Sequence, residues 1–222
     1  MKFFHWIVAL LFPPKCVLCG RILEKDETDL CRVCRVDNPE CVAYRRKFTF
    51  LDGWAAIWYY EGLVRESILR YKFRGARSYA KCYSRMLAMK LTQEYPDGFD
   101  VLTWIPISPQ RLQERGFDQV ELLAGAVGEE LGMRPRKLLK KIRNNPPQSG
   151  ISGEAERRAN VLGAYRVTEP DAVRGKRILM LDDVITTGAT VSEAARMLLT
   201  AGAKRVCCGA VAVARRDGKN SR

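Results

Sequence analysis

The stretch RILMLDDVITTGAT, residues 177–190, decides the fold of this chain. Its continuous apolar run at residues 178–181 is typical of a strand that is buried on both faces of a parallel sheet. Apolar residues then return with the spacing of a helix that packs on one face, and Gly202 ends the run. The apolar positions are Val191, Ala194, Ala195, Leu198 and Leu199. The stretch therefore predicts a strand, an acidic turn, a Thr/Gly loop and a helix, in that order.

The Thr/Gly loop lies between the carboxyl end of the predicted strand and the amino end of the predicted helix. Unpaired N–H groups at such a position attract phosphate, and open α/β sheets bind ligands at this edge. Gly188 lets a ligand approach the backbone closely. Asp182 and Asp183 would repel a phosphate, but they can accept hydrogen bonds from a sugar diol or face a hydrated Mg²⁺. A ribose 5-phosphate satisfies both halves, whereas the alternative is a plain strand, loop and helix with two surface aspartates.

Residues 179–190 resemble the phosphoribosyl pyrophosphate (PRPP) signature of type I phosphoribosyltransferases. The resemblance implies that Asp182 and Asp183 hold the ribose 2′- and 3′-hydroxyls. It also implies that the next residues bind the 5′-phosphate of PRPP. These residues are Thr186, Thr187, Gly188, Ala189 and Thr190. The fold class implied is α/β: a mostly parallel, type I phosphoribosyltransferase-like sheet with helices on both faces, plus a small N-terminal zinc-binding module.

A second loop leaves a predicted strand at residues 101–105 and should open onto the same edge of the sheet. It begins with Pro106, Ile107 and Ser108. Arg111 and Arg115 follow four residues apart and can grip a polyphosphate, although a solvated helix face is the alternative. In type I phosphoribosyltransferases a loop at this place contacts pyrophosphate. The expected PRPP site therefore combines both loops.

Further motifs narrow the resemblance to the ComF competence family. They are YKFRG at residues 71–75, RGFDQ at residues 115–119, and Gln148 with Arg157 and Asn160. The family resemblance implies a role in DNA uptake during natural transformation or in DNA utilisation. It makes single-stranded DNA and other DNA-uptake proteins candidate partners. The residues that would contact DNA or phosphate are Lys72, Arg74, Arg115 and Arg157, although YKFRG can also be a helix end whose basic residues complement the dipole.

Two CxxC pairs, Cys16 with Cys19 and Cys31 with Cys34, are separated by eleven residues. Four thiolates around Zn²⁺ make a closed, structural site without an open position for catalysis. A redox site needs only one CxxC in a βαβ setting, and two disulfides would need an oxidising compartment. We therefore expect structural zinc, and Cys41 is a spare ligand or a bystander. The N-terminal module of the ComF family is similar.

Length and net charge limit the possible domain organisation and the kind of partner. The chain has 222 residues and a formal charge of +13, from 38 Lys and Arg against 25 Asp and Glu. This length suits one well-buried domain with a small appendage, and the charge favours an anionic partner. The expected divisions are residues 1–45 for an apolar helix and the zinc module, 46–216 for the phosphoribosyltransferase-like domain and 217–222 for a tail.

The apolar residues 1–12 are too short to span a bilayer, and no small-residue cleavage site follows them. A short helix docked on the body is expected, with membrane contact as the alternative, and the protein is expected to be cytoplasmic. Elsewhere, Tyr71, Phe73 and Tyr79 alternate with basic residues. This pattern suits single-stranded DNA better than the basic run at residues 134–143, which has no aromatic residue.

The resemblance implies that an active enzyme would displace pyrophosphate from C1 of PRPP by an unknown nucleophile. Catalysis would come from positioning and from stabilising the departing pyrophosphate with Mg²⁺ and basic groups. The residues expected to carry it are Asp182, Asp183, Arg111 and Arg115. Three hypotheses follow: a PRPP-binding protein of DNA uptake, an active phosphoribosyltransferase of nucleotide metabolism, and a zinc-anchored adaptor for other proteins.

Overall fold

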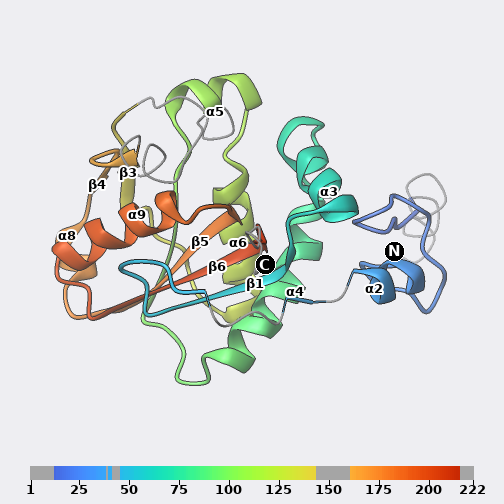
Figure 1. Ribbon diagram of the computed structural model, residues 1–222, viewed down its shortest axis with the longest axis horizontal. Coiled ribbons are helices and arrows are strands. Elements are labelled where there is room, and N and C mark those ends of the chain that lie inside the picture. Colours follow the sequence, from blue (N-terminus) through green and yellow to red (C-terminus); the bar gives the residue numbers. More distant parts are fainter. Residues whose placement is uncertain (1–12, 39, 42–45, 144–160, 216–222) are drawn as a thin grey trace, which may run out of the picture.

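The computed structural model describes residues 13–38, 40, 41, 46–143 and 161–215. Among these residues a four-stranded parallel sheet forms the centre of the molecule (Figure 1). Its strands, in spatial order, are β1 (Gly53–Tyr59), β6 (Arg205–Val213), β5 (Arg177–Ile185) and β2 (Val101–Trp104). The parallel sheet confirms the α/β class expected from the sequence.

Helices cover both faces of this sheet. One hydrophobic cluster joins one face to α3 (Gly62–Phe73), α4 (Tyr79–Glu94) and α6 (Gln119–Leu131). A second cluster joins the other face to α9 (Ala189–Thr200) and to a small antiparallel hairpin. The remaining elements are α2 (Arg32–Asp37), α5 (Pro109–Arg115), β3 (Leu139–Lys141), β4 (Tyr165–Val167) and α8 (Pro170–Val173).

Strand β5 is buried on both faces, as its apolar run predicts. Leu179 and Leu181 belong to the cluster with α4 and α6, whereas Ile178 and Met180 belong to the cluster with α9. All four side chains are fully buried. The central strand therefore holds the two halves of the core together.

The acidic pair lies inside β5 and not in a turn, which corrects one sequence-based expectation. Asp182 is paired with Ala210 of β6, and the ladder continues to Ile185, which is paired with Val213. The neighbouring strand β6 is long enough to carry the pairing past the carboxylates. Because successive side chains of a strand point to opposite faces, Asp182 and Asp183 face opposite sides of the sheet.

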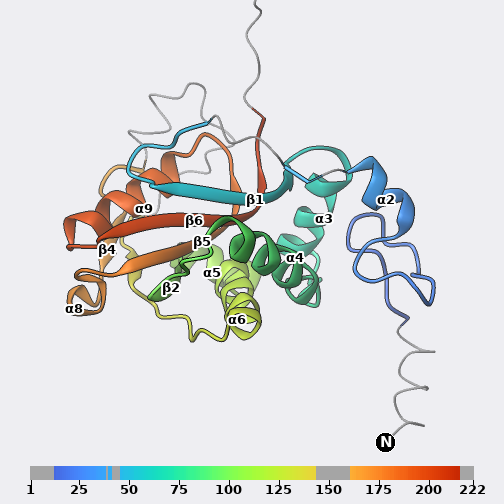
Figure 2. The ribbon, with the colours of Figure 1, turned by 90° about the horizontal axis from the view of Figure 1, so that it is seen from below.

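The cysteine-containing segment packs against α3 and α4. Figure 2 shows it at the end of the molecule beside α3, opposite α8. Ser67 donates a hydrogen bond to the carbonyl of Val17, and Arg85 forms an ion pair with Asp29. Val17 and Leu18 are fully buried and belong to the same hydrophobic cluster as α3 and α4. The segment therefore shares a core with the sheet domain, while the division expected after residue 45 stays a prediction.

The two chain ends carry predictions that the structure leaves untested. The apolar residues 1–12 and the tail 217–222 lie outside the described residues. None of the described helices is long and apolar enough to cross a membrane.

Two glycines of α6 provide a test of the packing. A Cβ at Gly128 would collide with the backbone carbonyl of Met133, whereas one at Gly125 would meet no atom within 4 Å. Gly128→Ala should therefore lower the free energy of unfolding by about 1–3 kcal/mol, as overpacking does. Gly125→Ala should raise it by about 0.5–1 kcal/mol, because alanine favours helix. Urea unfolding measures both, and equal effects would contradict the close approach of α6 to residue 133.

Candidate functional site

The loop after β5 turns sharply and leads directly into α9. Gly188 has φ +89° and is the N-cap of this helix, a backbone conformation that favours glycine. A Cβ at this position would also collide with the ring of Phe48. Position 188 is therefore restricted to glycine by both conformation and packing, and the N–H groups at the start of α9 lie at the end of the sheet.

A segment from the other end of the chain supports this loop. The Arg46 guanidinium donates hydrogen bonds to the carbonyl of Thr186, at 2.8 Å, and to the carbonyl of Ala214, at 3.0 Å. The same guanidinium stacks over the Phe48 ring, 4.5 Å from its centroid. Arg46 and Phe48 therefore fix the path of residues 186–188, a role that the sequence alone did not reveal.

The two aspartates of β5 have different surroundings. Asp183 is only 5 % exposed, and both of its carboxylate oxygens are engaged. Oδ1 is 2.7 Å from Nζ of Lys72, and Oδ2 accepts a 2.7 Å hydrogen bond from Nε2 of Gln119. Asp182 is half-buried, and its Oδ1 accepts a hydrogen bond from the N–H of Asp183. Asp183 is therefore held between α3 and α6.

Asp182 faces the hairpin on the other side of the sheet. Burial raises the pKa of Asp182 above its usual range, and the charge of Asp183 adds to this rise. Burial lowers the pKa of Lys141 to about 8, and nearby Arg111 adds to the effect, whereas Asp182 opposes it. Nζ of Lys141 lies 5.7 Å from the centroid of the Tyr165 ring. The hairpin thus brings a partly buried cation toward Asp182.

The second predicted loop reaches the same edge of the sheet. Strand β2 pairs with β5, and the N–H of Ile105 donates to the carbonyl of Leu181. Beyond it, the N–H of Ile107 donates to Oδ2 of Asp118, and the hydroxyl of Ser108 caps α5. Asp118 also caps α6 and therefore joins the loop to that helix. The structure brings Pro106, Ile107 and Ser108 to the edge at which Asp182 lies.

The predicted basic contacts divide into three groups. Lys72 contacts Asp183, and the half-buried Arg115 stacks over the Phe73 ring at 4.6 Å. Arg74 is exposed at the end of α3. Arg157 lies outside the described residues. The first group belongs to the site, while the roles of all these residues stay predictions.

The aromatic pattern is partly corrected by the structure. Tyr71 is fully buried, and its hydroxyl donates a 2.6 Å hydrogen bond to the carbonyl of Gln119. A nucleobase therefore cannot stack on this ring. Phe73 is 61 % exposed and remains available as a platform.

Sequence reasoning missed several residues of the site. Asp118 and Gln119 belong to the RGFDQ motif, in which only the arginine is expected from the sequence to contact a ligand. Lys141 belongs to a basic run that favours a solvated face. Its partial burial depends on the pairing of β3 with β4, which no local pattern predicts.

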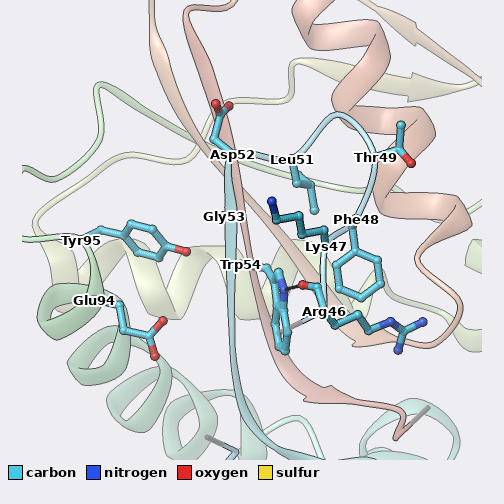
Figure 3. A pocket seen from close by; sticks show the side chains of 10 residues that line it. All are labelled: Arg46, Lys47, Phe48, Thr49, Leu51, Asp52, Gly53, Trp54, Glu94 and Tyr95. Carbon is cyan, nitrogen blue, oxygen red and sulfur yellow. Dashed lines mark hydrogen bonds between the residues drawn. The ribbon is translucent and has the colours of Figure 1, made fainter. Parts of the chain in front are cut away.

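A cavity of about 610 Å³ lies beside the edge strand β1 (Figure 3). Figure 3 shows the rings of Phe48 and Trp54 on one side of β1 and that of Tyr95 on the other. The cavity contains none of the predicted PRPP-site residues. It adjoins the site only through Arg46 and Phe48, which support the loop after β5.

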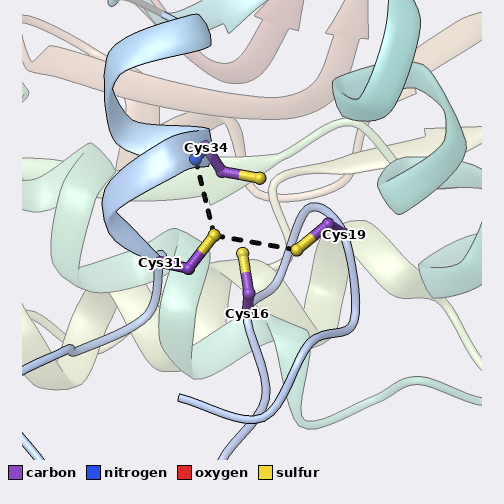
Figure 4. A group of neighbouring side chains, drawn as sticks. All are labelled: Cys16, Cys19, Cys31 and Cys34. Atoms are coloured by element: carbon purple, nitrogen blue, oxygen red, sulfur yellow. Dashed lines mark hydrogen bonds between the residues drawn. The ribbon is translucent and has the colours of Figure 1, made fainter. Parts of the chain in front are cut away.

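Four cysteines converge at the opposite end of the molecule. Figure 4 shows the sulfurs of Cys16, Cys19, Cys31 and Cys34 pointing toward a common centre. All four Sγ atoms lie within 4.8 Å of one another, and those of Cys19 and Cys31 are 3.8 Å apart. A tetrahedral zinc with Zn–S bonds of about 2.3 Å has sulfurs about 3.8 Å apart. The cluster is therefore compatible with zinc.

The four thiols of the cluster differ in their surroundings, and burial raises the pKa of Cys19 and Cys34. Burial raises the pKa of the Cys31 thiol, but hydrogen bonds from Cys34 and from the other thiols outweigh burial and lower it to about 7. The N–H of Cys34 donates to Sγ of Cys31 at 3.4 Å. Among the described residues, Cys41 is not a member of the group.

Comparison with known proteins identifies the family. The phosphoribosyl transferase domain model matches residues 122–222. The competence protein ComFC of Bacillus subtilis (strain 168) is 31% identical over 187 residues, which cover 84% of this chain and 72% of the relative. The chain belongs to the ComFC family.

Two further relatives of this ComFC-family chain are a competence protein and a DNA utilization protein. The competence protein ComFC of Streptococcus pneumoniae is 30% identical, over 86% of this chain and 96% of the relative. The DNA utilization protein YhgH of Escherichia coli (strain K12) is 27% identical, over 91% of this chain and 88% of the relative. The parallel sheet, together with the matched domain model, confirms the expected type I phosphoribosyltransferase fold.

Solved structures similar to the ComFC-family chain include the glutamine PRPP amidotransferase of B. subtilis complexed with ADP and GMP. The TM-score is 0.44 at 25% identity, and the match covers 64% of this chain and 30% of that one.

Proposed function

We propose that the chain binds PRPP with Mg²⁺ at the edge where β5 and β2 end. The observation that carries this proposal is the path of residues 182–190. A half-buried carboxylate, Asp182, is followed by a sharp turn at Gly188 and by the first turn of α9. A helix N-terminus favours phosphate, and a carboxylate accepts hydrogen bonds from sugar hydroxyls. A single ribose 5-phosphate satisfies both groups.

The loop after β5 would hold the 5′-phosphate through backbone N–H groups and threonine hydroxyls. The residues assigned to this role are Thr186, Thr187, Gly188, Ala189 and Thr190. Asp182 and Asp183 would accept hydrogen bonds from the ribose hydroxyls. Each carboxylate oxygen has two lone pairs, so Asp183 can accept a further bond beside those from Lys72 and Gln119. These two contacts hold its carboxylate in one orientation.

The pyrophosphate would lie over the loop after β2. The residues assigned to it are Pro106, Ile107, Ser108, Arg111 and Arg115. Lys141 adds a cation from the hairpin, on the side that Asp182 faces. The donor set also fits Mg²⁺, which keeps several waters and binds through one or two carboxylates and substrate phosphates. When bound, Mg²⁺ would neutralise charge on the pyrophosphate.

The same groups can support transfer of the phosphoribosyl group, which is the alternative function. In that reaction the bond from C1 to pyrophosphate breaks and its electron pair leaves with pyrophosphate. A nucleophilic atom of the acceptor bonds to C1 and loses its proton. Arg111 and Arg115 would stabilise the departing charge. Release of pyrophosphate with an acceptor supports this alternative, and its absence across bases, ammonia and nucleotides contradicts it.

The PRPP proposal is tested by calorimetric titration of PRPP and Mg²⁺. Asp182→Asn should weaken binding by roughly 10- to 100-fold, since a hydrogen bond to a charged group contributes about 1.5–3 kcal/mol. Asp171→Asn is the matched control, because the side chain of Asp171 is 95 % exposed and lies in α8. Equal affinity for PRPP in wild type and Asp182→Asn would overturn the site.

We also propose that the PRPP site serves DNA uptake or DNA utilisation, with single-stranded DNA and other DNA-uptake proteins as partners. The names of the relatives and the formal charge of +13 support this setting. Lys72, Arg74 and Arg115 would contact DNA or phosphate beside the exposed Phe73. With three phosphate contacts, affinity for a single-stranded oligonucleotide should fall roughly 20-fold between 50 and 200 mM salt. If the oligonucleotide does not bind, or binds with an affinity that does not depend on salt, this part of the proposal is wrong.

The four-cysteine cluster is proposed to hold structural zinc. A strong chelator should remove one zinc per chain and lower the melting temperature by about 10 °C or more, since structural zinc contributes roughly 10 kcal/mol. Cys31→Ser should also lower the melting temperature, because Cys31 lies in the core shared with α3 and α4. Cys82→Ser, outside the cluster, is the control. Retention of zinc by Cys31→Ser, or a melting temperature that chelation leaves unchanged, would contradict the assignment.

A further inference from the structure

A second, smaller cavity lies between the residues that follow α3 and the turn that joins α5 to α6. Its volume is about 140 Å³. Its lining includes three cations, one carboxylate and two aromatic rings: Lys72, Arg77, Arg115, Glu114, Phe73 and Phe117. Cations dominate this lining, so the cavity is suited to an anion.

Two stacked pairs orient the arginines of this cavity. Arg115 lies over the Phe73 ring and Arg77 over the Phe117 ring, each 4.6 Å from the centroid. Phe73 and Arg77 lie in residues 72–77, whereas Arg115 and Phe117 lie in residues 114–117. Each stacked pair therefore joins the two segments. A guanidinium that stacks on a ring keeps its N–H donors directed outward in its plane. It can therefore bind a phosphate through two hydrogen bonds.

Among the described residues, the carboxylates of Asp183, Asp118 and Glu114 act on the charge of Arg115 at longer range. No salt bridge there involves Arg77 or Arg115. The only carboxylate in the lining, Glu114, is exposed and accepts a 2.9 Å hydrogen bond from Gln110. Lys72 is paired with Asp183, so the charge left for a ligand is that of Arg77 and Arg115.

The cavity adjoins the proposed PRPP site but is not part of its phosphate loop. Lys72 lines the cavity and contacts Asp183. Phe117 packs against the cluster that includes α3, α4 and α6, whereas Ile185 and Val191, which flank residues 186–190, belong to the cluster on the other face. The sheet and the paired Asp183 therefore separate the cavity from residues 186–190, while Arg115 is common to the cavity and to the set assigned to pyrophosphate.

The size of the cavity and the exposed ring beside it indicate which kind of anion would bind. Pockets for whole drug-sized ligands occupy about 300–1,000 Å³, so this cavity has room for a single small group such as a phosphate. Phe73 is 61 % exposed at the same place. Nucleobases stack on aromatic rings of this kind. A phosphate in the cavity and a base on Phe73 together describe one nucleotide.

We propose that the cavity between residues 72–77 and 114–117 is a phosphate subsite that binds a nucleoside monophosphate alongside PRPP. Binding itself needs only the geometry above. The further assignment of this nucleotide as the acceptor, or as an effector of the PRPP site, rests on the proposed function.

Calorimetric titration of thymidine 5′-monophosphate, with and without saturating PRPP and Mg²⁺, tests the proposal. Wild type should bind the nucleotide under both conditions, and thymidine should bind at least tenfold more weakly because it lacks the phosphate. Arg77→Gln should weaken nucleotide binding by about tenfold or more, as loss of a charged hydrogen bond does, and Arg77→Lys should fall between. Arg205→Gln is the control, because Arg205 also stacks on a ring, Tyr95, away from the cavity.

The outcomes separate this inference from the proposed function. Competition between the nucleotide and PRPP would overturn it, because the cavity would then belong to the PRPP site. Equal binding of thymidine and its monophosphate, or an unchanged affinity in Arg77→Gln, would also overturn it. If PRPP fails to bind while nucleotide binding depends on Arg77, the proposed function fails and the subsite stands. Melting curves confirm that each variant is folded.

Discussion

The buried carboxylate of Asp183 and its two partners determine how the rest of the site is built. A buried charge is costly unless it is paired and hydrogen-bonded, so β5 can carry an aspartate here only if neighbouring elements supply partners. Lys72 at the end of α3 and Gln119 at the start of α6 do so. The hydroxyl of Tyr71 also binds the carbonyl of Gln119, which joins the same two helices. One side chain therefore fixes the relative positions of three elements.

The alternation of β5 gives its two carboxylates different surroundings. Asp183 faces α3 and α6, where it contacts Lys72 and adjoins the small cationic cavity. Asp182 faces the hairpin with Lys141 and is half-buried near the start of α9. A ligand at Asp182 and a ligand at the cavity would be connected through the polypeptide of a single strand. If both proposed ligands bind, β5 is the element that connects their sites.

Local patterns predicted the parts of the fold that depend on local chemistry. The apolar run of β5, the spacing of α9 and the two CxxC pairs each specify one element or cluster, and the structure has all three. The continuation of β5 past Asp182 was not predictable, because it depends on pairing with β6. Support of Gly188 by Arg46 and Phe48 joins residues about 140 positions apart and leaves no sequence signature. Tyr71 looked like an exposed platform because its burial depends on how α3 packs.

The central claim is that residues at the start of α9 hold the phosphate of PRPP. Hydrogen exchange of backbone amides, followed by mass spectrometry with and without PRPP and Mg²⁺, tests it most directly. The account predicts that exchange slows in peptides that cover residues 186–192, since a bound phosphate engages these N–H groups. PRPP that binds while exchange at residues 186–192 stays unchanged would contradict it.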